Sequence, residues 1–284
     1  MRLRHARGEL TLDRCLVMGI VNRTPDSFYD GGRMGLDESL DHARRLVEEG
    51  ADLLDLGAVK AGPGEVVDES EEARRLLPMV EELRGIGIPL AVETGRTSVA
   101  RAALEAGASI VNDVTGLADE ELADVCAATG AGLIAMHHGG QLRGRPRHPR
   151  FVDVVRDVVD TWERLVARAT SAGVREDRII VDPGLDFGKT TFHSLELMRR
   201  LAELTAVRWP VLLAPSRKDV VGETLDLPPD DRLEGTLALV VLAVVGGVSV
   251  VRVHDVEAAI RSVRMTETVM GRRPPAAPLR GLWE

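Results

Sequence analysis

Short, wholly apolar runs alternate along the chain with longer stretches in which apolar residues recur every three or four positions. The short runs are typical of strands buried on both faces of a parallel sheet, and the longer period is that of amphipathic helices. We expect strands at residues 16–21, 53–56, 89–92, 109–112, 132–136, 179–182, 211–214 and 250–253. We expect helices at residues 39–49, 70–83, 98–106, 120–127, 152–172, 195–204, 235–246 and 256–270.

This regular alternation, without a linker-like gap, favours one closed α/β architecture over two halves of a doubly wound sheet. We therefore predict a single (β/α)8 TIM barrel over residues 1–284, with a lead-in at 1–14 and a C-terminal tail at 271–284. Polar residues follow almost every strand, and in a barrel the carboxyl ends of the strands converge on one face. We expect these residues to line one site: Asn22, Asp55, Glu93, Asn112, Asp182, Ser216, Lys218, Arg252 and His254.

Composition narrows the class of protein. The chain has 284 residues, of which 44% are hydrophobic and 3% aromatic, and its net charge is −9, so a general nucleic-acid or membrane surface is not expected. We find no signal-peptide pattern, and the longest apolar stretch, 237–251, is broken by two glycines and is too short to span a bilayer. Two cysteines far apart in sequence predict buried thiols in a reduced, cytoplasmic setting.

The segment 18–33, MGIVNRTPDSFYDGGR, is the most informative part of the chain, because an apolar strand runs directly into a polar loop. An ordinary turn has much the same composition. However, α/β folds place their ligand chemistry at the carboxyl ends of parallel strands, and the same arrangement recurs at the later strands. We therefore interpret this loop as part of a binding site.

Several motifs resemble those of the dihydropteroate synthases, and the resemblance covers about residues 15–270. The motifs are MGIVNRTPDSFYDGG (18–32), AALEAGASIVNDVTG (102–116), VDPGLDFGKT (181–190), SRK (216–218) and RVHDV (252–256). The resemblance implies a transferase that displaces pyrophosphate from a hydroxymethyl-dihydropterin diphosphate with the amine of p-aminobenzoate. It also implies Mg²⁺ on the diphosphate and a homodimer built from the late helices.

The residue chemistry agrees with a pterin ligand. Asp182 can accept hydrogen bonds from ring N–H and amino groups, Asn112 can donate and accept, and Lys218 can donate to a ring carbonyl. These three match the family's pterin ligands, with Glu93 at a further pterin position and Phe187 expected against the ring. The resemblance assigns further roles: diphosphate to Asn22, Arg252 and His254, the metal to Asn22, the p-aminobenzoate side to Ser216 and Pro63, and catalysis to Lys218, Arg252 and His254.

Read independently, Arg252 and His254 are two basic residues two positions apart on a strand, so their side chains share a face and we expect their charges to add there. Loss of pyrophosphate leaves a developing cation at the pterin methylene. We therefore expect leaving-group stabilisation and positioning to matter more than proton transfer.

The chain departs from the family pattern in three places: the second loop, the end of the third strand and the first loop. Where the second loop carries Ser-Thr-Arg-Pro-Gly, this chain has Lys60-Ala61-Gly62-Pro63-Gly64, so the Thr and Arg are Ala61 and Gly62. Loss of such a charge-assisted donor corresponds to about 10²–10³ in rate. The Asp after the third strand is Glu93, and Arg23 replaces a small apolar residue in the first loop. The pattern is similar to a divergent second copy of the synthase in actinobacteria that lacks robust activity.

Two further features each allow two interpretations. The segment 141–150, QLRGRPRHPR, is either a solvated loop or a replacement anion site for the missing arginine. The neighbours His137 and His138 suggest a metal, but adjacent strand residues point to opposite faces and no cysteine or second spaced histidine completes a zinc set.

Three functions therefore stay open. The main hypothesis is a pterin- and phosphate-binding homologue with weak or no synthase activity. One form of this hypothesis is that the protein pairs with an active paralogue. The alternatives are an active synthase and a pterin-dependent methyltransferase, and the diphosphate-type loop argues against the methyltransferase.

Overall fold

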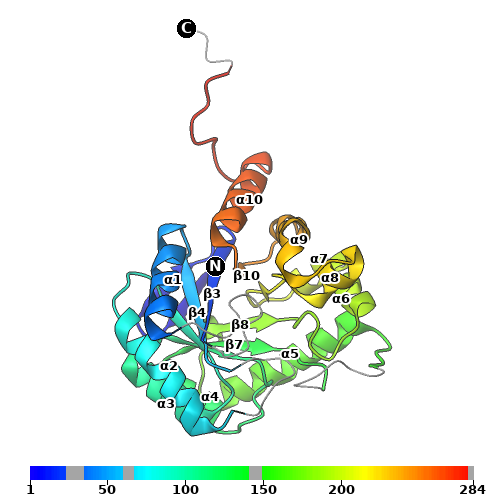
Figure 1. The fold of residues 1–284 in the computed structure, drawn as a ribbon. Helices are drawn as coiled ribbons and strands as arrows, with labels where there is room; N and C mark the ends of the chain where they lie inside the picture. Colours follow the sequence, from blue (N-terminus) through cyan, green and yellow to red (C-terminus); the bar gives the residue numbers. More distant parts are fainter. Residues whose placement is uncertain (24–34, 60–66, 141–148, 281–284) are drawn as a thin grey trace.

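In the computed structural model, which describes residues 1–23, 35–59, 67–140 and 149–280, eight parallel strands form a barrel surrounded by helices (Figure 1). The barrel strands are β3 (Leu16–Asn22), β4 (Leu53–Gly57), β5 (Leu90–Glu93), β6 (Ile110–Asp113), β7 (Gly132–Met136), β8 (Ile179–Asp182), β9 (Leu212–Leu213) and β10 (Val250–Val253). All eight coincide with predicted strands to within two residues at each end.

The order of the strands closes the barrel. Neighbouring strands follow the order β8-β7-β6-β5-β4-β3-β10-β9, and every pair in this series is parallel. A parallel bridge between Val181 and Val211 joins the two ends of the series, and the amide of Val181 donates to the carbonyl of Pro210 at 3.0 Å. The predicted (β/α)8 barrel is confirmed.

The helices cover the outside of the barrel (Figure 1). They are α1 (Leu36–Glu48), α2 (Glu69–Leu83), α3 (Thr97–Ala106), α4 (Leu122–Thr129), α5 (Val154–Ser171), α6 (Thr191–Arg199), α7 (Leu201–Thr205), α8 (Asp219–Leu225), α9 (Leu233–Val245) and α10 (Val256–Val269), with short 3-10 turns η1 (Glu176–Arg178) and η2 (Pro229–Asp231). Two differ from expectation: the helix predicted at 195–204 is interrupted at Arg200, and α8 was not predicted.

Helix starts follow the local sequence. The carboxylate of Asp68 accepts from the amide of Glu71 at 2.8 Å at the start of α2. At the start of α5, the carboxylate of Asp153 accepts from the amides of Val155 and Arg156 at 2.9 and 3.0 Å. Such caps satisfy amides that have no partner within the helix.

The molecule has two apolar cores, separated by the wall of the barrel. The larger lies between strands and helices and includes Trp162. The smaller fills the barrel interior and contains Leu3, Leu16, Met18, Leu53, Ala91, Ile110, Ile134, Ile180, Leu212, Ala214 and Val250. Leu3 comes from the expected lead-in, where β1 (Arg2–His5) and β2 (Gly8–Thr11) form an antiparallel hairpin that the apolar pattern did not predict. This hairpin covers the amino-terminal end of the barrel.

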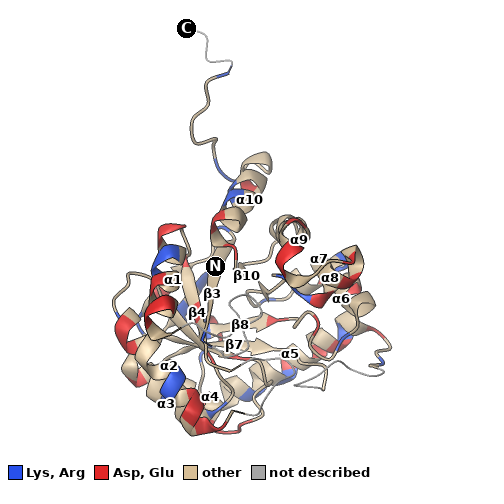
Figure 2. Ribbon diagram, viewed as in Figure 1, with Lys and Arg blue, Asp and Glu red and all other residues tan. Residues whose placement is uncertain are grey.

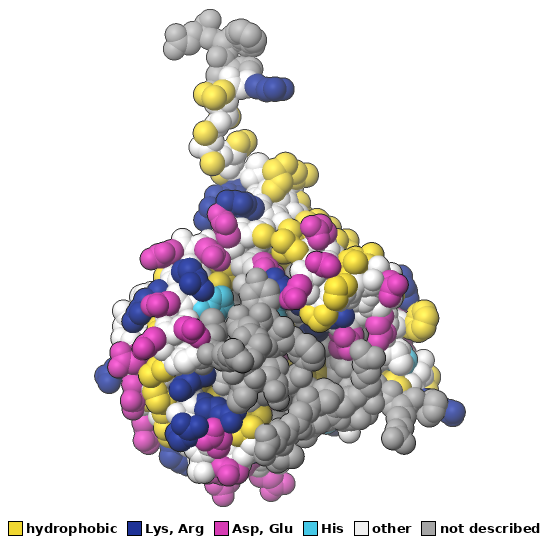
Figure 3. Space-filling model, in the orientation of Figure 1, with side chains coloured by type: hydrophobic (Ala, Val, Ile, Leu, Met, Phe, Trp, Pro, Cys, Tyr) yellow, Lys and Arg dark blue, Asp and Glu magenta, His cyan; other side chains and the backbone are white. Residues whose placement is uncertain are grey.

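The late helices carry an exposed apolar surface. On α9, Leu242 and Val245 are exposed, and on α10 so are Met265 and Val269; Figure 3 shows these helices covered with hydrophobic side chains. After α10 the chain leaves the barrel as an extended tail (Figure 1). Elsewhere basic and acidic side chains are interspersed over the helices (Figure 2). Across the described ranges, every helix is too short or too polar to cross a membrane.

Candidate functional site

The site follows from the two-residue period of the strands. Five residues of the interior core are Leu53, Ala91, Ile110, Ile180 and Val250. Because alternate residues of a strand face the same side, the next inward position on each strand lies two residues further along. Those positions are Asp55, Glu93, Asn112, Asp182 and Arg252. The barrel interior therefore changes from apolar to charged toward the carboxyl ends of its strands, where barrel enzymes carry their active sites.

Arg252 is held between two buried carboxylates. Its Nε lies 2.5 Å from Oδ2 of Asp55, and its Nη2 lies 2.6 Å from Oε2 of Glu93. The side chain of Asp55 is fully buried, and those of Glu93 and Arg252 are 9% and 14% exposed. Since β10 and β5 are separated by two strands in the sheet, the Glu93–Arg252 pair crosses the barrel interior.

Asn112 joins the same group from β6. Its Nδ2 donates to Oδ2 of Asp55 at 2.9 Å, so Asn112 and Arg252 share one carboxylate oxygen. The other oxygen of Asp55, Oδ1, is buried and has no hydrogen-bond partner among the residues that the structure describes. A buried carboxylate oxygen without a donor is costly, so a donor from a ligand would be stabilised there.

Burial and charge act in opposite directions on Glu93. Burial raises the pKa of Glu93 to about 7, because the charged form loses its water, while the Arg252 guanidinium opposes the shift. Burial also disfavours the charged form of Arg252, but the carboxylates of Asp55 and Glu93 outweigh it and raise the pKa of Arg252. The proton on Glu93 is thus coupled to the charges around it.

Asp182 and Lys218 lie together beside this group. Oδ1 of Asp182 accepts from the amide of Gly184 at 2.7 Å, and burial raises the pKa of Asp182. Gly184 has a φ of 61°, and a Cβ there would lie 2.1 Å from the carbonyl oxygen of His137, so this turn requires glycine. Burial lowers the pKa of Lys218, and the Asp182 charge opposes that shift.

Lys218 also contacts the loop after β8. Its Nζ donates to the carbonyl of Leu185 at 2.7 Å and lies 4.9 Å from the centroid of the Phe187 ring. The predicted neighbours Asp182, Phe187 and Lys218 are therefore brought together at one end of the barrel. Lys218 is positioned by an ammonium–ring contact as well as by a hydrogen bond.

His254 is not the cation that the sequence suggested. Its Nδ1 lies 2.9 Å from Oγ of Ser216, which also accepts from the His254 amide at 3.2 Å. Burial, followed by the charges of Arg252 and Arg217, lowers the pKa of His254 to about 3. The imidazole is therefore neutral at pH 7. The expected addition of two positive charges was wrong, although the two residues do lie near each other.

Arg217, next to Ser216, forms two hydrogen bonds to Asp255, with Nε–Oδ2 at 3.0 Å and Nη2–Oδ1 at 2.7 Å. This fork-shaped pair fixes the guanidinium beside His254. Its positive charge is therefore offset by a neighbouring carboxylate.

Asn22, at the end of β3, lies against β4. An added Cβ at Gly57 would come within 2.7 Å of Oδ1 of Asn22, so glycine at that position leaves room for the amide. In the parallel register Asn22 is opposite Gly57, and Gly57 is opposite Glu93. Asn22 therefore lies on the same strand-end row as the carboxylate pair.

Some predicted site residues lie outside the described residues. These include Pro63 with the rest of 60–66, and 141–148 of the arginine-rich segment. Arg23 is described: its Nη1 donates to the carbonyl of Arg75 on α2 at 2.8 Å. Its guanidinium is therefore anchored to that helix.

The sequence did not single out Lys189, which is 3% exposed. Its Nζ donates to the carbonyls of His137, Gly184 and Phe187 at 3.2, 2.9 and 3.0 Å, and burial lowers its pKa to about 7. The sequence feature that could have identified Lys189 is its place in the VDPGLDFGKT motif, one residue before the end. Lys189 ties the loop after β8 to the end of β7.

The two adjacent histidines contact different parts of the chain. Nε2 of His137 lies 2.8 Å from Oδ1 of Asp157, and His138 accepts from the amide of Gly140 at 3.1 Å. No group of three or more potential metal-binding side chains occurs within the portion of the chain that the structure describes. Each of the two imidazoles therefore has a hydrogen-bond partner within the protein.

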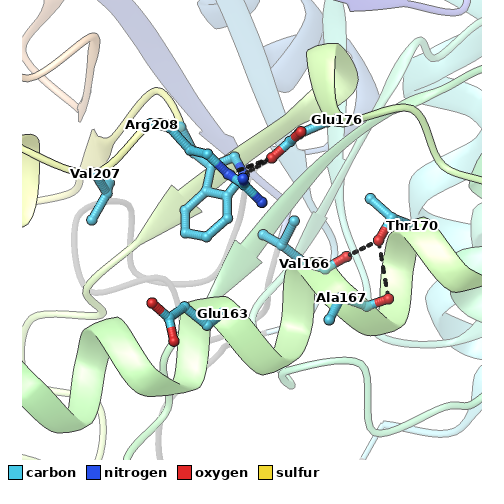
Figure 4. Close-up of a pocket in the computed structure, with 8 residues that line it drawn as sticks. Glu163, Val166, Ala167, Thr170, Glu176, Val207 and Arg208 are labelled. Carbon is cyan, nitrogen blue, oxygen red and sulfur yellow. Dashed lines mark hydrogen bonds and ion pairs between the residues drawn. The ribbon is translucent and has the colours of Figure 1, made fainter.

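A second cavity, of about 650 Å³, lies outside the barrel between α5, η1 and the segment before β9 (Figure 4). Arg208 lies over the Trp209 ring at 4.9 Å, and both Nε of Arg208 and Nε1 of Trp209 contact Oε1 of Glu176 at 2.7 Å. None of the predicted site residues lines this outer cavity. The candidate site is therefore the charged layer inside the barrel.

The chain is similar in sequence and in structure to known proteins. Residues 18–254 match the family described as pterin binding enzyme. The chain is 48% identical over 278 residues to the inactive dihydropteroate synthase 2 of Mycobacterium leprae, covering 95% of this chain and 96% of that protein. It is 40% identical over 264 residues to the dihydropteroate synthase of Bacillus subtilis, covering 92% and 90%. A structure of Yersinia pestis dihydropteroate synthase with a sulfonamide drug superposes with a TM-score of 0.92 at 35% identity, covering 95% of this chain and all of that one.

Proposed function

Because the chain belongs to the pterin-binding family of dihydropteroate synthases, we propose that it binds a pterin ligand and has weak or no synthase activity. The observation that carries this proposal is the presence of buried Asn112 and Asp182 beside half-buried Lys218 at one end of the barrel. These side chains supply the acceptors and donors that an aminopyrimidinone edge requires. Phe187 offers a ring against which a planar heterocycle can stack, and Glu93 lies beside it as a further pterin contact.

The other half of the site supports low activity. We assign the diphosphate to Asn22, Arg252 and His254, and the p-aminobenzoate side to Ser216 and Pro63. The second loop has Ala61 and Gly62 in place of Thr and Arg, so this loop lacks the arginine that would donate to the leaving group. Removing a donor of this type lowers rates by about 10²–10³. The high identity to a mycobacterial protein named as inactive agrees with this proposal.

Mg²⁺ fits this site as an ion that binds together with the diphosphate. Oδ1 of Asn22 lies in the space left by Gly57, and amide oxygens are suitable ligands for this hard cation. A site with one protein oxygen ligand is sufficient, because Mg²⁺ usually keeps several water ligands and binds the phosphates of the substrate. When bound, the ion would neutralise charge on the leaving group.

Arg252 and Lys218 would then position the ligand. Lys218 donates to the ring carbonyl, Arg252 lies between the ring and the phosphates, and neutral His254 donates or accepts a hydrogen bond at the phosphate end. Synthesis, where it occurs, forms a C–N bond at the pterin methylene and breaks the C–O bond to pyrophosphate.

Calorimetry with the pterin diphosphate and Mg²⁺, followed by a pyrophosphate-release assay with p-aminobenzoate, tests this proposal. We expect measurable pterin binding and a release rate about 10² or more below that of an ordinary synthase. A folded protein that binds no pterin would overturn the proposed function.

The second candidate is an active dihydropteroate synthase of folate biosynthesis. It is favoured by one observation, the presence of all three proposed catalytic side chains, Lys218, Arg252 and His254, at one end of the barrel. A release rate within about tenfold of an ordinary synthase would select this candidate. It would also mean that other groups, such as Arg23 or Lys60, replace the missing contacts.

We further propose a cytoplasmic homodimer. The exposed apolar side chains of α9 and α10 supply a surface of the kind that subunit interfaces cover.

A further inference from the structure

The contact between Glu93 and Arg252 depends on the length of the glutamate side chain. Oε2 of Glu93 lies 2.6 Å from Nη2 of Arg252 across the barrel interior. Withdrawing the carboxylate by one methylene, about 1.5 Å, would lengthen this contact to about 4 Å, beyond hydrogen-bonding distance. An aspartate on the same backbone would therefore leave that edge of the guanidinium free.

Among the residues that the structure describes, the charges near the proposed phosphate end do not sum to a positive field. The single charge of Arg252 faces the two carboxylates of Asp55 and Glu93 at 2.5 and 2.6 Å. Arg217 is paired with Asp255, and His254 is neutral at pH 7. An incoming diphosphate would therefore meet a guanidinium whose charge is already balanced, in a buried setting where solvent screens charges poorly.

The buried carboxylates of this site suit a neutral ligand that carries several N–H donors. Oδ1 of Asp55 is buried without a donor among the described residues, and Asp182 supplies a second carboxylate. An aminopyrimidinone edge brings N–H groups to such acceptors without adding negative charge.

We propose that Glu93 is the specificity-determining residue of this site: by holding Arg252 across the barrel, it makes the pocket accept a pterin-type heterocycle without a diphosphate about as well as the diphosphate ester. This inference rests on the proposed function and adds the ligand class. Glu93 acts here as a positioning residue for Arg252, and the paired guanidinium then no longer distinguishes the two ligands.

The test is the ratio of two dissociation constants, measured by calorimetry for 6-hydroxymethyl-7,8-dihydropterin and for its diphosphate at the same Mg²⁺ concentration. In the unmodified protein we expect the two constants to agree within about threefold. In Glu93→Asp we expect the diphosphate to bind about tenfold or more tightly than the alcohol, because Arg252 regains a free edge for charge-assisted hydrogen bonds. The readout is the ratio of the two constants, so a change in pterin affinity that is common to both ligands does not affect the test.

Two further variants keep the test decisive. Glu93→Gln keeps the side-chain length and removes its charge, so the ratio should move in the same direction even where Glu93→Asp folds poorly. Glu267→Asp is the matched control: Glu267 is 2% exposed and accepts from the Cys15 amide at 3.0 Å at the opposite end of the barrel. Its ratio should equal that of the unmodified protein.

The outcomes separate this inference from the proposed function. An unmodified protein that already binds the diphosphate about tenfold or more tightly than the alcohol overturns the inference and leaves pterin binding intact. An unchanged ratio in both Glu93 variants also overturns it. A folded protein that binds neither pterin overturns the proposed function, and the inference with it.

Discussion

Arg252 and Asp55 are joined by a 2.5 Å contact between Nε and Oδ2, although 197 residues separate them in the sequence. Arg252→Met would leave two carboxylates buried near each other without a cation. Breaking a buried pair in this way typically costs about 3–5 kcal/mol of unfolding free energy. Urea titration followed by circular dichroism at pH 8 measures the effect.

The same variant should recover part of its stability at pH 5. Without the guanidinium the carboxylates bind protons more readily in the folded state, and the protonated forms carry no uncompensated charge. The combined variant Asp55→Asn, Arg252→Met should be more stable at pH 8 than Arg252→Met alone. A loss below about 1 kcal/mol in Arg252→Met would mean that the pair contributes little.

Glu93 should make stability depend on pH. Its folded pKa is about 7, above the usual glutamate pKa of 4.5. The unfolded state therefore releases this proton first as the pH rises. The contribution of Glu93 is fully present below pH 4.5 and is lost as the pH rises through 7.

The difference in unfolding free energy between the unmodified protein and Glu93→Gln isolates this effect, because the other titrating groups are common to both. We expect the unmodified protein to lose stability relative to Glu93→Gln between pH 5 and 7.5, and to change little above that range. Burial is the main cause of the raised pKa of Glu93; Arg252 and Lys218 oppose it, and Asp55 and Glu72 add to it. A difference that stays constant from pH 5 to 8 would contradict the assignment.

Restoring the second loop should raise pyrophosphate release. Ala61→Thr with Gly62→Arg is expected to increase the rate about tenfold or more, part of the roughly 10²–10³ attributed to such a donor. Adding Glu93→Asp should increase it further, because this change frees an edge of Arg252 for charge-assisted hydrogen bonds to the diphosphate. A steady-state coupled assay for pyrophosphate measures all three proteins. An unmodified rate within about tenfold of an ordinary synthase would remove the basis of this prediction.

Leu242→Glu should disrupt a homodimer formed through α9 and α10. Leu242 is 50% exposed, and a charged side chain there would be buried in the interface. Phe192→Glu on α6 is the control, because Phe192 is 79% exposed and belongs to neither α9 nor α10. Light scattering coupled to size-exclusion chromatography should give a dimer for the unmodified and control proteins and a monomer for Leu242→Glu. A monomeric unmodified protein would rule out the homodimer.

The strands could be predicted because both of their faces are buried, so that each appears in the sequence as a continuous apolar run. The β1–β2 hairpin could not be predicted in this way. Only Leu3 and His5 of its residues are buried, so the hairpin contains no continuous apolar run. Helix α8 was missed for a similar reason, since it has seven residues and contains Gly222.

For the site, sequence position identified the residues but not their partners. Asp55, Glu93 and Arg252 each follow an apolar run, and the two-residue period explains why they face inward. The Glu93–Arg252 pair could not be predicted, because it joins strands that become close only when the barrel closes. The charge of His254 depends on burial and on Arg217, neither of which sequence spacing reveals.

The division of the barrel interior into an apolar and a charged layer has an evolutionary consequence. Residues such as Leu53 and Ile110 contribute to the buried core, whereas the inward side chains two positions later determine which molecule fits. Mutations in the second group can abolish one reaction without unfolding the chain. After gene duplication, a copy built in this way can lose its ancestral chemistry, persist as a folded protein and come under selection for a different ligand.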